Sequence, residues 1–561
     1  MSELIIVRPD KCVGCNSCVR ACPCPEANTT KMLEDGRHIT TVNNDKCIAC
    51  GACVKACNHG ARDYLDDTDA AMSRIMKGEK LVILATPSIK AVYPTRWKNI
   101  LEWFRKKGCI IYDVSLGADI CTWAHLRAIE NKKVPNIITQ PCAAIVKYIE
   151  SYQPKLLTNL SPIHSPIACA CVFIRKYQKR TQPIAVLSPC IAKKNEFMDT
   201  GVADFNVTFK KLNEYFDRND IRIASHADNE FEYDFEDIQG QLGGVYPRPG
   251  GLRDNLWQHD PDINITTSEG VHKVYPELDM YAQMPEFKHP EVFDVLSCEF
   301  GCNIGPGTGT TQTAFDVMAS MRQYENNAKS RRKTTGFRGN GEDKLFKRFD
   351  DELKLNDFMR NYKPAKQTPL PTEQQLEGVY ETMGMHTEQD RNYNCHACGY
   401  KSCRDMAIAI YRGLNTPDNC IVHAKSVLVA KHSALATQHE KLAEITNECL
   451  SLSDTLKSGV DQIMTNMTTI GESTKATSER AGVVNNLLKN VVTFCNSNST
   501  MDAPTVKQLV SILETTISAF SALDDNVNTT NESSNIINKS ISEITELVDK
   551  INAELHKTTE V

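Results

Sequence analysis

The sequence predicts a modular chain in which a central α/β domain stands between two smaller cysteine-rich domains and is followed by an all-α region. Strand-like and helix-like segments alternate in the order LVILAT, KNILEWFRKKG, CIIYDVS and ADICTWAHLRAIENK, which is typical of an α/β fold. Most of the 23 cysteines stand in close C-x2-C or C-x3-C groups, which indicate cluster-binding domains. Beyond about residue 425, apolar residues recur at helical spacing, which indicates long helices.

Composition limits the classes of protein that fit. The 561 residues are 41% hydrophobic and 24% charged, enough for several globular domains. A net charge of -6 gives no reason to expect a nucleic-acid partner. No apolar run is long enough for a membrane span, and the start, MSELIIVRPDKC, lacks a signal-peptide pattern. So many grouped cysteines in a long chain favour iron–sulfur clusters over disulfides, so we expect a reducing, anaerobic cytoplasm.

Residues 1–65 contain CVGCNSCVRACP and CIACGACVKACN, each with the spacing C-x2-C-x2-C-x3-C. This is the run of two-cluster ferredoxins, in which the fourth cysteine of each run ligates the other cluster. Zinc, the alternative, favours four ligands per site without a crossed duplicate. We therefore expect an α+β electron-transfer domain with two [4Fe–4S] clusters, and Cys24 as a bystander. The expected ligands are Cys12, Cys15, Cys18 and Cys57 for one cluster, and Cys47, Cys50, Cys53 and Cys22 for the other.

The central domain, residues 75–365, holds four cysteines in three distant segments, each after a strand-like run. Cys142 follows VPNIIT, Cys190 follows IAVLS, and Cys298 and Cys302 follow VFDVLS. Thiolates at strand ends can converge on one buried cluster. Such a cluster can carry a second metal centre, which turns an electron-transfer protein into a redox catalyst.

The segments ATPSIKAVYP, TQPCAA, SPCIAKKNEF and SCEFGCNIGPG resemble the catalytic domain of [FeFe]-hydrogenases, and RFDDELKLNDFMRNY resembles its C-terminal stretch. The resemblance implies an H-cluster: a [4Fe–4S] cubane on the four cysteines, with Cys302 bridging to a di-iron subcluster that carries CO, cyanide and a dithiolate. It further implies that Lys193 donates a hydrogen bond to one cyanide and that Pro87 and Ser88 line the pocket near the other. The alternative for Lys193 is a solvated surface lysine.

Several residues depart from the family pattern. Pro141 stands where a cysteine usually relays protons, and proline has no proton to give. Ser188 and Leu296 replace methionines, while Ala124 and His125 fall where glutamates of the proton path are usual. Because proton transfer needs titratable groups within hydrogen-bond reach, slow turnover is expected unless another path exists.

Three residues are candidates for another proton path, namely Cys169, Glu299 and His125. Glu299 lies between two cluster cysteines in sequence, where a negative neighbour would raise its pKa. The alternatives are structural: Cys169 as a small buried hydrophobe and Glu299 as a solvent-facing residue.

Residues 385–425 contain NCHACGYKSCRDMAIAIYRGLNTPDNC, which resembles the four-cysteine domain of corrinoid iron–sulfur proteins and some redox sensors. The resemblance implies one further [4Fe–4S] cluster, although zinc suits four cysteines equally well. We expect a helix to begin at Cys403 and the cluster, placed after the central domain, to offer a second electron exit toward the C-terminus. The expected ligands are Cys395, Cys398, Cys403 and Cys420.

Residues 425–561 show sustained heptads interrupted by the turn-forming CNSNSTMDAP at 495–504. We expect two long helices that form an antiparallel hairpin and dimerise as a four-helix coiled coil; one continuous parallel dimer is the alternative. The Ser/Thr/Asn-rich seam resembles the signalling helices of chemotaxis receptors in texture only. A plain dimerisation stalk is the alternative to a signalling role.

Together these features lead to the hypothesis of a sensory [FeFe]-hydrogenase (group C or D) that reversibly binds and oxidises H2, with protons as the other substrate. Expected partners are a ferredoxin-like electron carrier, hydrogenase maturation proteins, a signalling partner and a second copy of the chain. A metabolic, ferredoxin-linked hydrogenase and a non-catalytic relative without the di-iron site are the alternatives.

Overall fold

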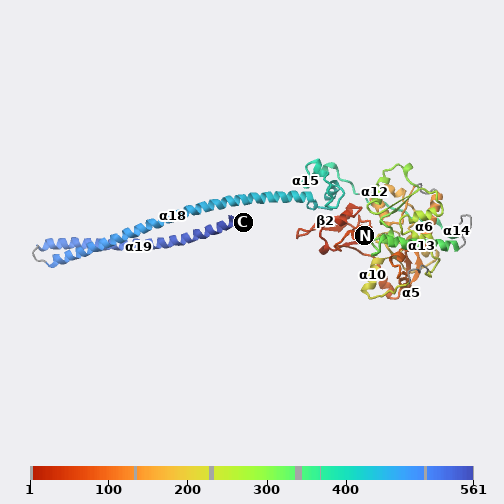
Figure 1. The fold of residues 1–561 in the computed structure, drawn as a ribbon, viewed down its shortest axis with the longest axis horizontal. Helices are drawn as coiled ribbons and strands as arrows, with labels where there is room; N and C mark the ends of the chain where they lie inside the picture. Colours follow the sequence, from red (N-terminus) through yellow and green to blue (C-terminus); the bar gives the residue numbers. More distant parts are fainter. Residues whose placement is uncertain are drawn as a thin grey trace. The chain divides into compact units, whose positions relative to one another are not determined.

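The computed structural model describes residues 4–131, 136–226, 233–334, 344–366, 368–497 and 502–559. Residues 134–135 of the expected strand run and 498–501 of the expected break lie outside these ranges. The chain divides into two units, Met1–Ser426 and Val427–Val561 (Figure 1). None of the described helices is both long and apolar enough to cross a membrane.

The N-terminal part of the first unit is a small α+β arrangement, as expected. Strand β1 (Ile5–Val7) pairs antiparallel with β4 (Arg62–Tyr64), and β2 (Asn28–Met32) pairs antiparallel with β3 (His38–Val42). Each cysteine run forms a loop that ends in a short helix, α1 (Ser17–Arg20) or α2 (Ala52–Ala56).

The central part contains two parallel sheets, which confirms the expected α/β fold. The first has the strand order β6-β5-β8-β9, and the second has the order β10-β11-β7. Strands β5, β8, β9 and β11 are buried along their whole length, as is usual for parallel sheets covered on both faces. The bounds are β5 Val82–Ala85, β6 Ile110–Asp113, β7 Ile137–Ile138, β8 Ile184–Ser188, β9 Phe205–Thr208, β10 Ile265–Glu269 and β11 Val292–Leu296.

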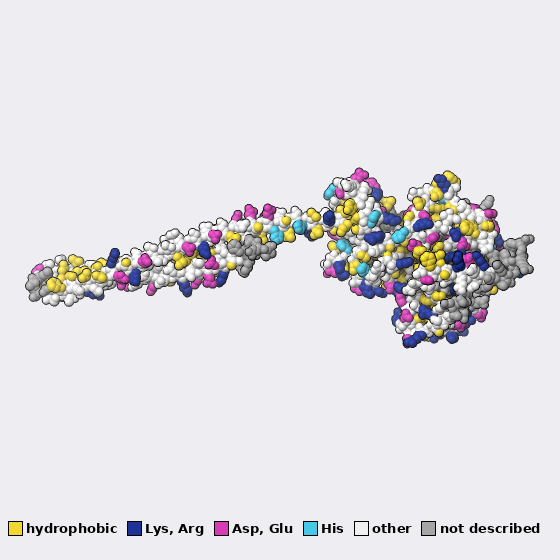
Figure 2. Space-filling view, in the orientation of Figure 1, with side chains coloured by type: hydrophobic (Ala, Val, Ile, Leu, Met, Phe, Trp, Pro, Cys, Tyr) yellow, Lys and Arg dark blue, Asp and Glu magenta, His cyan; other side chains and the backbone are white. Residues whose placement is uncertain are grey.

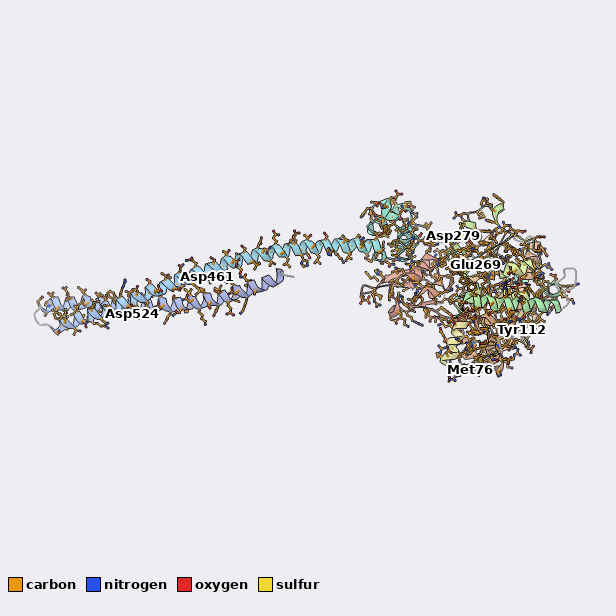
Figure 3. The ribbon with its side chains drawn as sticks, viewed as in Figure 1. Met76, Tyr112, Glu269, Asp279, Asp461 and Asp524 are labelled. Atoms are coloured by element: carbon orange, nitrogen blue, oxygen red, sulfur yellow. The ribbon has the colours of Figure 1, made fainter. Side chains whose placement is uncertain are left out.

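Helices connect and cover these strands. They are α3 Thr68–Met76, α4 Ser88–Val92, α5 Trp97–Lys106, α6 Val114–Glu130, α7 Ala143–Tyr152, α8 Pro166–Val172, α9 Lys193–Thr200, α10 Phe209–Arg218, α11 Gly251–Trp257, α12 Val274–Tyr281, α13 Ala314–Thr334 and α14 Lys344–Glu352. Asp279 of α12, labelled in Figure 3, accepts hydrogen bonds from Tyr148 Oη (2.7 Å) and Gln153 Nε2 (2.6 Å), which holds α7 beside α12.

Helix α6 is buried along most of its length and lies against α8. A Cβ on Gly117 would come within 2.3 Å of Pro166 O, so only glycine permits this close approach. The Asp113 carboxylate caps α6 by accepting from Ser115 N at 2.9 Å. The hydroxyl of Ser165 caps α8, which fixes the chain on both sides of the cavity described below.

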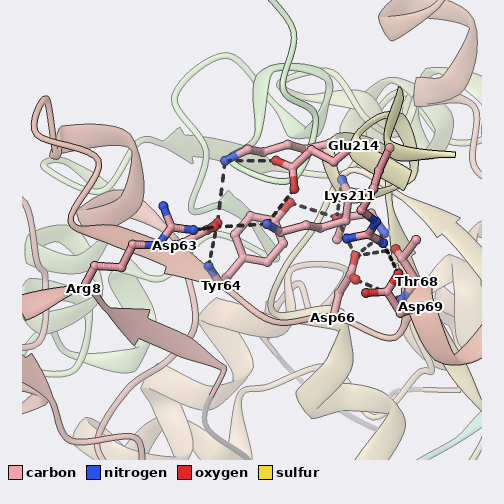
Figure 4. A network of polar contacts seen from close by, with 11 residues as sticks. Arg8, Asp63, Tyr64, Asp66, Thr68, Asp69, Lys211 and Glu214 are labelled. Carbon is pink, nitrogen blue, oxygen red and sulfur yellow. Dashed lines mark hydrogen bonds and ion pairs between the residues drawn. The ribbon is translucent and has the colours of Figure 1, made fainter. Parts of the chain in front are cut away.

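A polar network joins the N-terminal part to the central part (Figure 4). Asp63 accepts from Arg8 Nη2 at 2.9 Å and from Lys211 Nζ of α10 at 3.1 Å. Tyr64 is fully buried, and its hydroxyl lies 2.8 Å from Thr208 Oγ1. The two parts therefore meet through a packed and hydrogen-bonded boundary.

Residues 366–426 contain α15 (Glu373–Thr382), α16 (Glu388–Arg391) and α17 (Cys403–Tyr411). Helix α17 begins at Cys403, as expected from the sequence. Its N-cap is Ser402, whose side chain accepts from Asp405 N at 3.0 Å.

The second unit is an antiparallel helical hairpin, which confirms the expected pair of long helices. Helix α18 (Ile421–Ser497) begins in the first unit, and α19 (Ala503–Thr559) runs back along it (Figure 1). Lys457 Nζ lies 2.9 Å from Asp549 Oδ1, and Ser478 Oγ lies 2.6 Å from Oδ1 of Asp524, which Figure 3 labels. As residue numbers rise along α18, the numbers of their partners on α19 fall, which shows that the two helices are antiparallel.

Most seam residues of this hairpin are exposed within one chain. Val460, Met467 and Ile541 are buried together, whereas Leu452 is 72% exposed and Phe494 is 64% exposed. Figure 2 shows hydrophobic side chains gathered on the surface near the hairpin turn. One copy of the chain therefore leaves much of the expected heptad seam uncovered.

Candidate active site

The carboxyl ends of β5, β7, β8 and β11 converge on one cavity of about 90 Å³. Parallel sheets commonly place ligand sites at the carboxyl ends of their strands. The structure brings all four central cysteines to this cavity, together with Pro87, Ser88, Pro141 and Lys193. The cysteines are Cys142, Cys190, Cys298 and Cys302.

Burial raises the pKa of Cys190 to about 11, and it raises the pKa of Cys298 and Cys302 further above the ordinary range. Neighbouring thiols add to the effect, since Cys142, Cys190 and Cys302 all raise the pKa of Cys298. These thiols therefore hold their protons until a cationic metal centre displaces them. Four soft sulfur donors around one space fit an iron–sulfur cluster.

Tight backbone contacts hold the cysteine loops together. A Cβ on Gly305 would lie 3.5 Å from Cys298 Sγ, and one on Gly307 would lie 2.6 Å from Pro189 O. The backbone N–H of Cys302 donates to Pro247 O at 2.7 Å. The segment after Cys302 thus lies directly on the segment before Cys190, with no room for side chains.

Lys193 is buried, with 6% of its surface exposed, so it is not a solvated surface lysine. Its Nζ donates to Ser165 Oγ at 3.0 Å and to Glu196 Oε2 at 2.5 Å. Burial alone would lower the pKa of Lys193, but the Glu196 carboxylate raises it above its ordinary value. Burial would likewise raise the pKa of Glu196, but Lys193 and Arg360 hold it below its ordinary value. Lys193 therefore stays a cation in the cavity wall.

Ser88 offers a hydroxyl without a partner in the described structure. It is fully buried at the first residue of α4, after Pro87, and its Oγ makes no hydrogen bond. Buried polar atoms without partners are rare in folded proteins. A group that fills the cavity and accepts a hydrogen bond would satisfy this hydroxyl, so Ser88 fits an anionic ligand.

Cys169 lies behind the cavity wall, fully buried, with its Sγ 3.3 Å from His164 O. Cys121 Sγ lies 3.4 Å from the same oxygen and 3.6 Å from His125 Nδ1. Burial would raise the pKa of Cys121, but the Cys169 hydrogen bond and cationic His125 bring it to about 5. His125 Nε2 reaches Ser161 Oγ at 2.9 Å.

Sequence reasoning missed four contributors to this region. Cys121, Glu196, Ser165 and Tyr246 were not among the predicted site residues. Tyr246 lines the cavity, and its hydroxyl lies 2.7 Å from Thr122 Oγ1. No sequence signal marks these residues except that Glu196 stands one helical turn after Lys193.

Glu299 lies outside the cavity. It is exposed and lines a separate surface cleft of about 360 Å³ together with Cys50, His272 and Phe300. Neither Glu299 nor Cys169 is among the residues that line the cavity.

Cys50 of the second N-terminal run has a cysteine of the first run as a neighbour. Burial raises the pKa of Cys50 well above its ordinary value, and Cys22, Cys53 and Cys47 raise it further. Cys22 of the first run therefore lies among the cysteines of the second. Cys24 is buried beside them.

The expected ligands of the other N-terminal cluster lie in and before α1 and at the end of α2. Cys12 and Cys15 lie in the loop that leads into α1, Cys18 lies in α1, and Cys57 follows α2. The Ser17 side chain, 3.5 Å from Cys15 Sγ, lowers the pKa of that thiol. Arg62 Nη2 donates to Cys18 Sγ at 3.2 Å.

The four cysteines of the third motif line one small pocket. Burial raises the pKa of Cys398, and Cys420, Cys395 and Cys403 raise it further. Among the described residues, no group of three or more His, Cys, Asp or Glu side chains is spaced for a single metal ion.

Three family models match the chain. Residues 80–276 match "Iron only hydrogenase large subunit, C-terminal domain", residues 4–58 match "4Fe-4S dicluster domain", and residues 392–422 match "Putative Fe-S cluster". No curated protein matches the sequence. The chain thus carries an iron-only hydrogenase-like domain together with a 4Fe–4S dicluster domain and a segment similar to a putative Fe–S cluster domain.

Solved [FeFe]-hydrogenase structures are also similar to the chain. One, reported for stepwise H-cluster assembly, is 12% identical and covers 54% of this chain and 99% of its own, with a TM-score of 0.37. A variant of the enzyme from Chlamydomonas reinhardtii is 14% identical, covers 54% and 100%, and has a TM-score of 0.37. An apo variant from the same organism is 13% identical, covers 53% and 99%, and has a TM-score of 0.39.

Proposed function

We propose that this chain is an [FeFe]-hydrogenase-like redox protein that reversibly binds and slowly oxidises H2, acting as a hydrogen sensor. The observation that carries the proposal is the composition of one cavity wall. Four cysteines, a buried cationic Lys193 and an unpartnered Ser88 hydroxyl surround the same space, while Pro141 occupies part of that wall without a proton to give.

The residues present fit an H-cluster. The four cysteines would hold the cubane, Cys302 would bridge to the di-iron subcluster, and Lys193 and Ser88 would donate hydrogen bonds to its cyanide ligands. When bound, this group supplies the chemistry that splits H2 heterolytically. Buried Val114, Ala118 and Leu296 exclude water from the same space.

Slow proton transfer follows from the positions of the remaining titratable groups. Pro141 lines the cavity in place of a proton donor. The buried Cys121–His125 pair and Cys169 lie behind the wall, and Glu299 lies outside it. Apart from the four cysteines, the titratable residues among the described ones that line the cavity are Lys193, which is held in an ion pair with Glu196, and the buried Tyr246. We therefore expect slow proton transfer, and a protein that binds H2 without rapid turnover suits a sensing role.

Electrons would leave through the N-terminal domain. A Cβ on Gly51, next to Cys50, would lie 2.4 Å from Pro306 Cγ, so this loop touches the loop that follows Cys302. Cys50 also raises the pKa of Cys298, which indicates that the two thiols are near neighbours. A ferredoxin-like carrier in a reducing cytoplasm is the corresponding partner.

The test is to mature the full chain with its di-iron subcluster anaerobically, and to record infrared bands of bound CO and cyanide together with the rate of H2 oxidation. We expect the bands and a turnover far below that of ordinary family members. The variant Cys302→Ser is the control, because it should lose the bands. Fast turnover would favour a metabolic hydrogenase, and missing bands in the native chain would leave a non-catalytic cluster protein.

A further inference from the structure

The four-cysteine domain, residues 385–425, lies directly on the N-terminal domain. Gly399, which follows Cys398, has a φ of 91°, and a Cβ there would lie 2.7 Å from Val19 Cβ and 3.0 Å from Asn16 O. Val19 belongs to α1, which contains Cys18 and ends two residues before Cys22. The ligand loop of the third motif therefore touches a helix that carries one expected ligand and lies next to an expected ligand of the other N-terminal cluster.

A reciprocal pair of side-chain amides connects the two ligand loops. Asn16 Nδ2 donates to Asn419 Oδ1 at 2.9 Å, and Asn419 Nδ2 donates to Asn16 Oδ1 at 3.4 Å. Asn16 follows Cys15 directly, and Asn419 directly precedes Cys420. Only 6% of the Asn16 surface is exposed, so these hydrogen bonds are shielded from water and hold the loops in place.

Further contacts fasten the same boundary. Thr30 N donates to Leu414 O at 2.8 Å, and Arg20 Nη2 donates to His396 O at 3.4 Å. Arg412, whose side chain is largely buried, forms an ion pair with Glu26. The boundary thus combines backbone, amide and charged contacts, which is more than a flexible tether would give.

Tyr400 stands between the two sets of ligands. It is buried in one hydrophobic cluster with Cys18 of the N-terminal domain and with Cys398 of the third motif. The side chain is therefore near thiols of both domains.

We infer that the four-cysteine domain is a redox relay that receives electrons from the N-terminal clusters. It does not take them directly from the central domain. One electron leaves a reduced N-terminal cluster, which is oxidised, and enters the third cluster, which is reduced; no bond forms and no proton moves. The inference rests on the proposed function only in taking H2 as the natural source of that electron.

The position of Cys420 connects the third cluster to the start of helix α18. Its carbonyl accepts from Ala424 N at 2.9 Å, so the last expected ligand also belongs to the first turn of α18. A change of charge at the third cluster would therefore arise at the first turn of the longest helix in the described chain. The electron exit toward the C-terminus that the sequence leads us to expect would thus start from the N-terminal clusters.

The test uses the full chain with its [4Fe–4S] clusters reconstituted but without a di-iron subcluster, so that H2 chemistry has no influence on it. Iron and zinc contents are measured first, and electron paramagnetic resonance spectra are then recorded during stepwise reduction with dithionite. We expect magnetic coupling between the third cluster and a reduced N-terminal cluster. Zinc in the third site, or a native spectrum without coupling, would overturn the inference.

Two glycines provide a matched pair of variants. Gly399 and Gly413 both have positive φ, but a Cβ on Gly413 would meet nothing within 4 Å. We expect Gly399→Ala to lose the coupling and Gly413→Ala to keep it. Should Gly399→Ala fail to assemble the third cluster, Asn419→Ala tests the same boundary with less strain. Unchanged coupling in Asn419→Ala would then contradict the proposed contact.

Discussion

Two side chains with opposite hydrogen-bonding properties, one a charged donor and one without any donor, line the same small cavity. Lys193 is a buried cation whose charge is kept by Glu196 at 2.5 Å, whereas Pro141 has neither a side-chain donor nor a backbone N–H. The cavity is thus prepared to stabilise negative charge but poorly prepared to exchange protons. Under the proposed function, these two residues would separate the binding of H2 from its turnover.

Replacing Pro141 by cysteine should restore a proton donor at the cavity wall. Because positioned general acids and bases contribute roughly 10²–10⁴-fold to rates, we expect Pro141→Cys to raise H2 oxidation by about 100-fold or more. Hydrogen uptake by the matured full chain measures this, with Pro141→Ala as the control for the loss of proline alone. Equal rates for both variants would place the slow step elsewhere.

Removing the partner of Lys193 should destabilise the fold. Glu196→Gln leaves a buried cation without its main counter-charge, and we expect a loss of about 3–5 kcal/mol in the free energy of unfolding. Anaerobic urea unfolding measures it. Glu214→Gln is the matched control, because Lys211 and Glu214 also form an i,i+3 pair but Glu214 is 46% exposed, so little should change. Similar losses in both variants would argue against a special role for the buried pair.

At the scale of elements, the residue that follows β7 is hydrogen-bonded to the middle of β11. Thr139 Oγ1 donates to Asp294 Oδ1 at 3.2 Å, and Arg253 N donates to Asp294 Oδ2 at 3.2 Å. Burial in the middle of β11 raises the pKa of Asp294 to about 6. The strand therefore carries a carboxyl group that prefers to be neutral.

Stability should fall as pH rises through the pKa of Asp294. Its pKa is raised in the folded state, so its contribution is full at low pH and is lost as the carboxyl ionises near pH 6. We expect Asp294→Asn to gain on the order of 1 kcal/mol relative to the native chain between pH 5 and pH 8. Urea unfolding at both values measures the difference, and a pH-independent difference would contradict the assignment.

The cysteine motifs were predictable because their chemistry is written in local spacing. The strands before Cys142, Cys190 and Cys298 also followed from short apolar runs, and the pair of long C-terminal helices followed from periodicity. The burial of the Lys193–Glu196 pair and the amide pair of Asn16 and Asn419 were not predictable. The first depends on how a helix packs at the cavity, and the second joins residues 403 positions apart.

At the scale of the whole molecule, the first unit contains a cavity suited to a ligand, and the second unit has an exposed apolar surface suited to a partner. The first unit surrounds its cavity with ligands and buried charge. The second is a hairpin with only a few buried seam residues, although apolar side chains continue along both helices. A helical pair with so much exposed apolar surface is typical of an association surface.

We expect the hairpin to pair with a second copy of the chain through this exposed seam. Leu452→Glu places a charge on the seam and should shift the full chain from dimer toward monomer in light scattering. Ser451→Glu, one exposed position away, is the matched control and should leave the dimer intact. A native chain that is monomeric at micromolar concentration would contradict this expectation.

The absence of a side chain at Gly51 has a consequence for the rate of electron transfer. The loop that carries Cys50 rests against Pro306 and Ile191 with no side chain between them. Electron tunnelling slows exponentially with distance. Because Gly51 has no side chain, the expected cluster at Cys50 can lie closer to the expected cluster in the cavity than a larger residue would allow. One glycine, which takes no part in the chemistry, would therefore set the rate at which electrons pass from the cavity to the N-terminal domain.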